Sequence, residues 1–253
     1  MIVLQISDCH LVAAGDTLLG VDTQATLEAV LEHAIAAHQP DAIIASGDLA
    51  HTPQAEVYER FGATVRRYTE APLLCLAGNH DVLAPMVEAG LPMDALQIGD
   101  WNIVPLDSHQ DDAPAALVEQ ADRDAAGKAL AAAGGNHCLV ATHHPLVEVN
   151  SPWLDKDRIQ NPAELVEWLS ECSVVSGISR LRGVVFGHAH QAVEAVCGGV
   201  PVLGVPSTCF QFLPQSERFS LDDQAPGYRW LFLDDKEGGS GGGFTSRVER
   251  LNS

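Results

Sequence analysis

The feature that most constrains the fold is a recurring pair, a strand-length apolar run followed at once by a short polar signature. The pattern occurs five times in this chain of 253 residues. The apolar runs are Ile2–Ile6, Ala42–Ala45, Leu73–Leu76, Cys138–Ala141 and Gly183–Phe186. The signatures that follow them are Asp8-Cys9-His10, Gly47-Asp48, Gly78-Asn79-His80-Asp81, His143-His144-Pro145 and Gly187-His188-Ala189-His190. Aliphatic runs of this length indicate buried strands, so we expect five strands to end in oxygen and nitrogen donors that converge at one edge.

The segments between the first three runs have helical spacing. A first helix is expected to begin at a Thr23 cap and to end before Pro40. A second is expected from about Pro53 to Tyr68, and a short one after Pro85. This alternation of strand and helix predicts a βαβαβ unit with parallel strands.

The middle of the chain continues the alternation. A strand is expected over Trp101–Leu106 and an Ala-rich helix over Pro114–Ala133. A further helix is expected to run through Cys172, with Asn161 as its cap and Pro162 in its first turn, and Leu146–Gln160 is expected to form a loop.

Beyond His190 the sequence becomes strand-rich. Ala192–Cys197, Pro201–Val205 and Tyr228–Leu233 predict strands of a second sheet, and Phe244–Arg250 predicts a final short strand. The Gly-rich stretch 237–243 predicts a flexible loop.

Composition is that of one globular domain, with 46% hydrophobic residues and apolar runs too short to span a membrane. The first residues lead directly into a strand without a basic leader, so we expect a cytoplasmic protein. Six cysteines show no paired spacing and are expected to be reduced, namely Cys9, Cys75, Cys138, Cys172, Cys197 and Cys209.

The formal charge of −20 argues against nucleic acid and anionic membranes as partners, since both bind clustered Lys and Arg. The same negative charge would repel an anionic substrate such as a phosphate ester. Two divalent ions bound at the polar signatures would reverse the local charge, because bound metals dominate the field around them.

The donors favour borderline divalent metals. Two carboxylates, one carboxamide and several imidazoles suit manganese, iron, cobalt or zinc better than calcium, and the donor types do not choose among them. If the Asp-x-His segment is extended, Asp8 and His10 point to the same side and reach one ion, and Gly187-His188-Ala189-His190 repeats the device. A pair of ions roughly 3.5–4 Å apart activates water for attack on phosphorus. The pattern therefore favours phosphoester hydrolysis.

Each signature also has an ordinary explanation. Asp and Asn after glycine are common turn formers, and His144 can be an exposed neighbour. The joint occurrence of five signatures with compatible donors, each after a strand, favours the metal-binding interpretation.

The five signatures resemble the calcineurin-like metallophosphoesterases, whose pattern runs Asp-x-His, Gly-Asp, Gly-Asn-His-Asp/Glu, His and Gly-His-x-His. Further segments resemble the bacterial class III 3′,5′-cyclic-AMP phosphodiesterases. These are Trp153-Leu154-Asp155, Pro206-Ser207-Thr208-Cys209 and Pro226-Gly227-Tyr228-Arg229. The resemblance implies a four-layer αββα sandwich, with two mixed sheets face to face, helices outside, and a dinuclear metal site at the strand ends.

The resemblance also implies roles for individual residues. Asp8, His10 and His190 would hold one metal, Asn79, His143 and His188 the other, and Asp48 would bridge them. His80 would be the catalytic residue, contacting the phosphate and protonating the departing oxygen. His144 would lie behind the ligands or face the substrate. The expected substrate contacts are His10, Asp48, Asn79, His80, His144 and His190.

The function implied is hydrolysis of 3′,5′-cyclic AMP to 5′-AMP by a hydroxide that bridges two divalent or mixed-valence ions. One alternative is a broader phosphodiesterase acting on glycerophosphodiesters or 2′,3′-cyclic nucleotides, and another is a non-catalytic binding module on the same fold. Trp153, Phe210 and Phe212 either stack on a nucleobase or pack in the core. A homodimer is compatible with the sequence.

Overall fold

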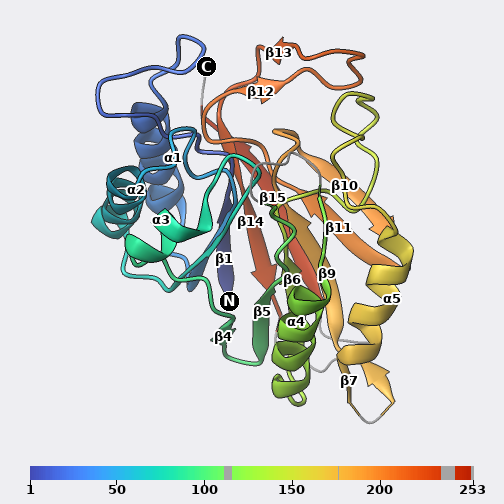
Figure 1. Cartoon of the computed structure of the whole chain (residues 1–253). Coiled ribbons are helices and arrows are strands. Elements are labelled where there is room, and N and C mark those ends of the chain that lie inside the picture. Colours follow the sequence, from blue (N-terminus) through green and yellow to red (C-terminus); the bar gives the residue numbers. More distant parts are fainter. Residues whose placement is uncertain (111–115, 176, 235–242, 252–253) are drawn as a thin grey trace.

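The computed structural model describes residues 1–110, 116–175, 177–234 and 243–251, and it is built around two large sheets (Figure 1). The helices are α1 (Thr23–Ala37), α2 (Ala55–Tyr68), α3 (Leu83–Glu88), α4 (Gln120–Ala132) and α5 (Pro162–Cys172). The strands of the two large sheets are β1 (Ile2–Ile6), β2 (Ala42–Ser46), β3 (Leu73–Leu76), β4 (Leu96–Ile98), β5 (Trp101–Pro105), β6 (His137–Ala141), β9 (Leu181–Phe186), β10 (Val193–Cys197), β11 (Val200–Gly204), β14 (Gly227–Leu233) and β15 (Phe244–Arg250). Two small hairpins pair β7 (Val174–Val175) with β8 (Ile178–Ser179) and β12 (Gln211–Phe212) with β13 (Leu221–Asp222).

The first sheet has five strands in the order β15-β14-β1-β2-β3. Strands β1, β2 and β3 are parallel, with Leu4 opposite Ile43 and Ile44 opposite Leu74. Strands β14 and β15 add to this unit in antiparallel register. The predicted βαβαβ unit is therefore present, extended by the last two strands of the chain.

The second sheet has six strands in the order β10-β11-β9-β6-β5-β4. Strands β5, β6, β9 and β11 run parallel, and β4 and β10 close the edges in antiparallel pairs. Strands β6 and β9, which precede His143 and His188, are thus neighbours at the centre of this sheet.

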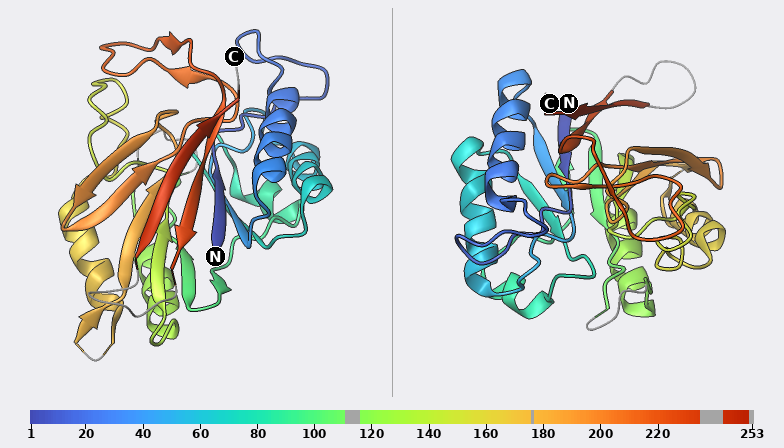
Figure 2. Two further views of the ribbon diagram at one scale, coloured as in Figure 1. Left: turned by 180° about the vertical axis from the view of Figure 1, so that it is seen from behind. Right: turned by 90° about the horizontal axis from the view of Figure 1, so that it is seen from above.

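Three apolar cores hold the layers together. Leu31 and Phe61 pack α1 and α2 on the outer face of the first sheet, and Leu130 and Leu169 pack α4 and α5 on the outer face of the second. The third core fills the space between the sheets, where Ile44 of the first meets Trp101 of the second. Seen from above in Figure 2, the helices lie outside and the two sheets inside. The predicted αββα sandwich is confirmed.

The strands that carry the signatures end at the same side of the sandwich, opposite the end marked N for β1 in Figure 1. The loop 146–160, predicted as a loop, and the β12–β13 hairpin lie on this side. In the ranges that the structure covers, no helix has the length and apolar character needed to cross a membrane. All six cysteines fall within those ranges as free thiols.

Two predicted helix starts are corrected, and the start of α5 at Asn161-Pro162 is confirmed without the expected side-chain cap. Helix α1 is capped by Asp22 and not by Thr23, since the Asp22 carboxylate accepts a hydrogen bond from Ala25 N. Asn161 occupies the cap position of α5, but its backbone is in the left-handed conformation and its side chain makes no capping hydrogen bond. Helix α4 starts at Gln120, later than predicted, because Glu119 and Asp122 form a reciprocal capping box.

The assignment of the late strands to one second sheet is also corrected. Strands β10 and β11 lie together in the second sheet, beside β9, whereas β14, predicted for the same sheet as these two, lies in the first sheet with β15 and β1. Strand β14 is apolar on both faces, with Trp230 in the outer core and Leu231 in the core between the sheets. A strand buried on both sides lies within a sheet and not at its margin. The predicted flexible loop 237–243 falls, except for Gly243, outside the described residues.

A buried arginine joins the two sheets. Arg229 of β14 is fully buried, and its guanidinium donates to the carbonyl oxygens of Gly204 and Val193 in the second sheet at 3.0 and 3.2 Å. It also donates to Ser246 Oγ at 2.6 Å and to a carboxylate oxygen of Glu194 at 3.2 Å. Gln5 of β1 makes a similar bridge, donating to Phe186 O at 3.2 Å. Arg229 and Gln5 thus link the two sheets through donors that end on backbone oxygens of the second sheet.

We predict that Arg229→Met lowers the free energy of unfolding by about 2–4 kcal/mol, because it leaves the carbonyl oxygens of Val193 in β10 and Gly204 in β11 without this donor. Urea unfolding followed by circular dichroism measures the change. Arg247→Met is the matched control, since the Arg247 side chain is half exposed and pairs only at the surface. Equal stability of the two variants would contradict the bridging role.

Candidate metal centre

A first group of donors combines the first strand end with the end of β9. His10 Nε2 lies 3.1 Å from His190 Nε2, and His190 Nε2 lies 3.4 Å from Asp8 Oδ1. Asp8, His10 and His190 are all buried. Their three donor atoms are close enough to hold one metal ion.

A second group combines the ends of β3, β6 and β9. The side-chain oxygen of Asn79 lies 2.9 Å from His188 Nδ1 and 3.2 Å from His143 Nε2. His143 and His188 are buried, and Asn79 is half-buried. His188 and His190 thus belong to different groups.

Asp48 lies between the two groups. Its Oδ2 is 3.6 Å from His10 Nε2, and its Oδ1 is 3.6 Å from His143 Nε2. Its side chain is 3% exposed, so nearly all of its contacts are with these donors and their loops. One carboxylate therefore faces both groups at once.

The donors owe their directions to an unusual backbone. Asp8, His10, Asp48, His188 and His190 all have positive φ, between 45° and 61°. Among the described non-glycine residues only four others share this conformation. The sequence-based picture of extended Asp-x-His segments is therefore wrong. Non-glycine residues in this region carry strain, which concentrates at functional sites and persists only where the surroundings enforce it.

Backbone carbonyl groups fix the ring orientation of two histidines. His143 Nδ1 donates to Ser46 O at 2.8 Å, and His190 Nδ1 donates to Phe210 O at 2.7 Å. A proton held at Nδ1 leaves Nε2 with its lone pair free. In both residues Nε2 is the atom that faces the other donors.

Charges in the site are adjusted by burial and by neighbouring groups. Burial, together with the charge of His143, lowers the pKa of His188 to about 3, which keeps that imidazole in its neutral, metal-binding form. Burial alone would raise the pKa of Asp8, but its electrostatic attraction and hydrogen bond to His190, followed by the interactions with His143 and His10, outweigh burial and lower that pKa. The carboxylate is thus held ionised.

Two further predicted residues lie differently. The His80 side chain is exposed at the mouth of the site, while its backbone N–H donates to Asp48 Oδ1 at 2.8 Å. His144 is fully buried, with Nδ1 2.8 Å from Ser108 Oγ and its ring 4.9 Å from that of His188. His144 therefore lies among the buried donors, with one ring nitrogen within 4.8 Å of those of His143 and His188.

Glycines in the signatures permit the close approach of these loops. A Cβ at Gly78 would overlap Asp48 Oδ1, and one at Gly187 would overlap Ser7 Oγ and lie 2.7 Å from Ser46 O. At Gly47, where φ is +96°, a Cβ would overlap the His143 ring. Gly47 and Gly78 are therefore required by a donor of another signature, and Gly187 is required mainly by the serines that precede two of the signatures.

Comparison with known families agrees with this geometry. Residues 1–192 match the family described as calcineurin-like phosphoesterase. The chain belongs to this family. The predicted family resemblance is therefore confirmed.

The chain is similar in sequence to several proteins that are named as cyclic-nucleotide phosphodiesterases. It is 38% identical over 245 residues to the 3′,5′-cyclic adenosine monophosphate phosphodiesterase CpdA of Pseudomonas aeruginosa, covering 93% of this chain and 86% of the relative. It is 34% identical to CpdA of Escherichia coli K12, covering 98% and 89%. It is 31% identical to a 3′,5′-cyclic-nucleotide phosphodiesterase of a Nostoc species, covering 98% and 92%.

Solved structures share the fold at low identity. GAP50 of Plasmodium matches with a TM-score of 0.61 and 10% identity, over 100% of this chain and 88% of the other. A purple acid phosphatase from yellow lupin matches with a TM-score of 0.57 and 14% identity, over 91% of this chain and 48% of the other. At such identities the likeness concerns the fold alone.

Phosphoesterases of this family act with divalent metal ions, and the donor set fits such ions. His10 Nε2 and His190 Nε2 lie 3.1 Å apart, so one cation can bind the lone pairs of both ring nitrogens. A carboxylate oxygen of Asp8 and one of Asp48 complete a mixed nitrogen and oxygen set of the kind borderline metals prefer.

Sequence reasoning assigned no role to three residues beside the donors. Asp81 is buried and accepts hydrogen bonds from Gly78, Leu49 and Ala50 N–H groups at 2.8, 3.1 and 3.0 Å, which ties the Asn79 loop to the Asp48 loop. Ser207 Oγ donates to Asp8 O at 2.8 Å and so supports the strained Asp8 backbone.

The third such residue is His51, whose ring lies 4.9 Å from that of His80. Asp81 and Ser207 stood inside recognised segments, and His51 follows Asp48 by three positions. The usable signal was therefore membership of a recognised segment for Asp81 and Ser207, and proximity to Asp48 in the sequence for His51.

We predict that Gly78→Ala lowers metal content to less than half and lowers activity at least tenfold, because its Cβ displaces the Asp48 carboxylate. Metal analysis of the purified protein and initial rates measure the two effects. Gly135→Ala is the control, since no atom lies within 4 Å of its added Cβ and φ is not in the left-handed region there. Full metal content in Gly78→Ala would show that Asp48 is not needed in its present position.

We predict that Asp48→Ala loses both ions, whereas Asn79→Ala loses one, because Asp48 faces both donor groups and Asn79 only one. Metal-to-protein ratios after dialysis against chelator and reloading with Mn²⁺ or Co²⁺ measure this. Two tightly bound ions in Asp48→Ala would refute the shared position of this carboxylate.

Proposed function

We propose that this phosphoesterase binds two divalent ions and hydrolyses 3′,5′-cyclic AMP to 5′-AMP. The observation that carries the proposal is the position of Asp48, whose two oxygens face separate donor groups at equal distances of 3.6 Å. Asp8, His10 and His190 would hold one ion, and Asn79, His143 and His188 the other. The names of the relatives, which cover nearly the whole chain, support the cyclic nucleotide as substrate.

When bound, such an ion pair activates water and neutralises charge on the phosphoryl group. In the hydrolysis the oxygen of water bonds to phosphorus, the P–O3′ bond breaks, and O3′ takes up a proton. We assign the supply of that proton to His80, whose side chain is exposed beside the donors while its backbone N–H is held by Asp48.

An aromatic cluster on the other side of the mouth suits a nucleobase. The ring of Phe212 stacks on His190 with centroids 3.9 Å apart, and Trp153 and Phe219 contact Phe212 at 5.0 and 5.5 Å. Phe219 is 54% exposed, so this cluster presents an open aromatic face beside the donors. Trp153 and Phe212 themselves pack against the outer core of the second sheet. We assign base stacking to Phe219, with Trp153 and Phe212 as its support.

The same proposal includes the metals and the location. Iron, manganese, cobalt and zinc all suit the donor set. We propose a cytoplasmic enzyme, as expected from the sequence, with a small cyclic nucleotide as its ligand.

We predict that the metal-loaded protein converts 3′,5′-cyclic AMP mainly to 5′-AMP, because the exposed His80 serves the departing O3′. Chromatography identifies the product, and kcat/KM is compared with that for 2′,3′-cyclic AMP and a glycerophosphodiester. Asp48→Ala treated in parallel is the inactive control.

Each contrary outcome has a distinct meaning. Exclusive formation of 3′-AMP would refute the assigned orientation. A preference of a hundredfold or more for another diester, about 2.7 kcal/mol in transition-state binding, would establish the broader phosphodiesterase. If the metal-loaded protein hydrolyses none of these diesters, the alternative of a non-catalytic binding module on the same fold would be supported.

A further inference from the structure

His51 lies at the mouth of the metal centre through the same backbone pairing that positions Asp48. Beyond the ends of β1 and β2 the two chains stay paired, with His10 N donating to Asp48 O at 2.9 Å and Leu11 N to Leu49 O at 3.0 Å. The next hydrogen bond joins His51 N to Leu11 O at 2.8 Å. His51 is therefore anchored by the donor loops and does not sit on a free segment.

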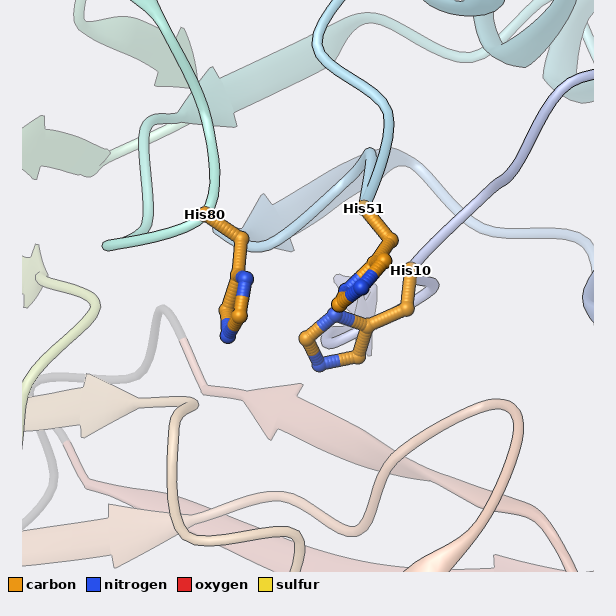
Figure 3. Close-up of side chains that lie close together, drawn as sticks. All are labelled: His10, His51 and His80. Carbon is orange, nitrogen blue, oxygen red and sulfur yellow. The ribbon is translucent and has the colours of Figure 1, made fainter. Parts of the chain in front are cut away.

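Three imidazole groups gather here from three loops, as Figure 3 shows for His10, His51 and His80. The ring centroids are 5.8 Å apart for His10 and His51, 5.0 Å for His10 and His80, and 4.9 Å for His51 and His80. One ring nitrogen from each lies within 4.8 Å of those of the others. His51 and His80 are exposed, so the group opens to solvent beside the metal centre.

His10 connects this group to the metal centre. Its Nε2 faces His190 and Asp48, as a metal ligand would. Its Nδ1 is buried and, within the described part of the chain, has no hydrogen-bond partner. An imidazole that binds metal through one nitrogen carries its proton on the other, so His10 Nδ1 is a donor that needs an acceptor.

We infer that His51 and His80, supported by His10, form an anion site that binds an oxygen of the substrate's phosphoryl group. This inference rests on the proposed phosphodiesterase function and adds a substrate contact to it. Neutral imidazoles each offer one N–H, and a negatively charged oxygen is the strongest acceptor for such donors.

The test uses orthophosphate as the probe on the full, metal-loaded chain. His51→Ala is expected to weaken orthophosphate binding, measured by calorimetry, at least fivefold, while metal content stays unchanged. His51→Gln keeps a side-chain N–H and is expected to recover part of the affinity. His38→Ala is the control, since His38 lies at the C-terminal end of α1 and contacts Trp230 and Phe232.

A second measurement separates a substrate contact from a structural role. With bis(p-nitrophenyl) phosphate as a diester that contains no nucleotide, His51→Ala is expected to raise KM at least fivefold and to change kcat less. Unchanged orthophosphate affinity and KM would overturn the inference, and so would a loss of bound metal, which would make His51 a ligand. If the chain cleaves this diester but not cyclic AMP, the proposed function fails while the His51 measurement still stands.

Discussion

The site depends on backbone hydrogen bonds that hold its donor residues in a strained conformation. Asp8 N donates to Gly47 O at 2.9 Å, and His188 N donates to the Asp8 carboxylate at 3.1 Å from either oxygen. These bonds tie the loops after β1, β2 and β9 to one another. Because each loop is held by another, no donor reaches its direction through its own sequence alone.

The frame behind these loops has to keep two sheets in fixed relation. The apolar core between them supplies most of the cohesion but little direction, since burial of apolar surface is not directional. Arg229 and Gln5 add directional contacts across the same space, each ending on backbone oxygens of the opposite sheet. Loops that carry donors from both sheets need such a fixed relation, because small displacements spoil a shared coordination site.

The strands and the donors were predictable because both depend on local pattern. Short aliphatic runs mark buried strands, and polar residues that follow them at one edge point to a common site. The division of the strands between the two sheets was harder to predict, since the pairing of β14 with β1 is a contact between the two ends of the chain. The cap of α1 at Asp22 and the start of α4 at Gln120 depended on which nearby side chain reaches a free backbone N–H.

The direction of the donors was the least predictable part. An extended Asp-x-His was the simple assumption, and the left-handed backbone at Asp8 and His10 follows only from pairing with Gly47 and Asp48. His144 shows the same limit, because its burial beside His188 is a property of the packed loops and not of the His-His-Pro order.

The division of the donors between the sheets links metal binding to the assembly of the fold. Asp8, His10, Asp48 and Asn79 follow strands of the first sheet, and His143, His188 and His190 follow strands of the second. An ion held by both sets is bound only when the sheets are docked. Its binding energy then counts toward docking, about 2.7 kcal/mol when the free ion is at a hundred times its Kd. Removal of the ions would therefore first weaken the packing of the two sheets against each other. The helices that cover the outer faces of the sheets lie far from this contact.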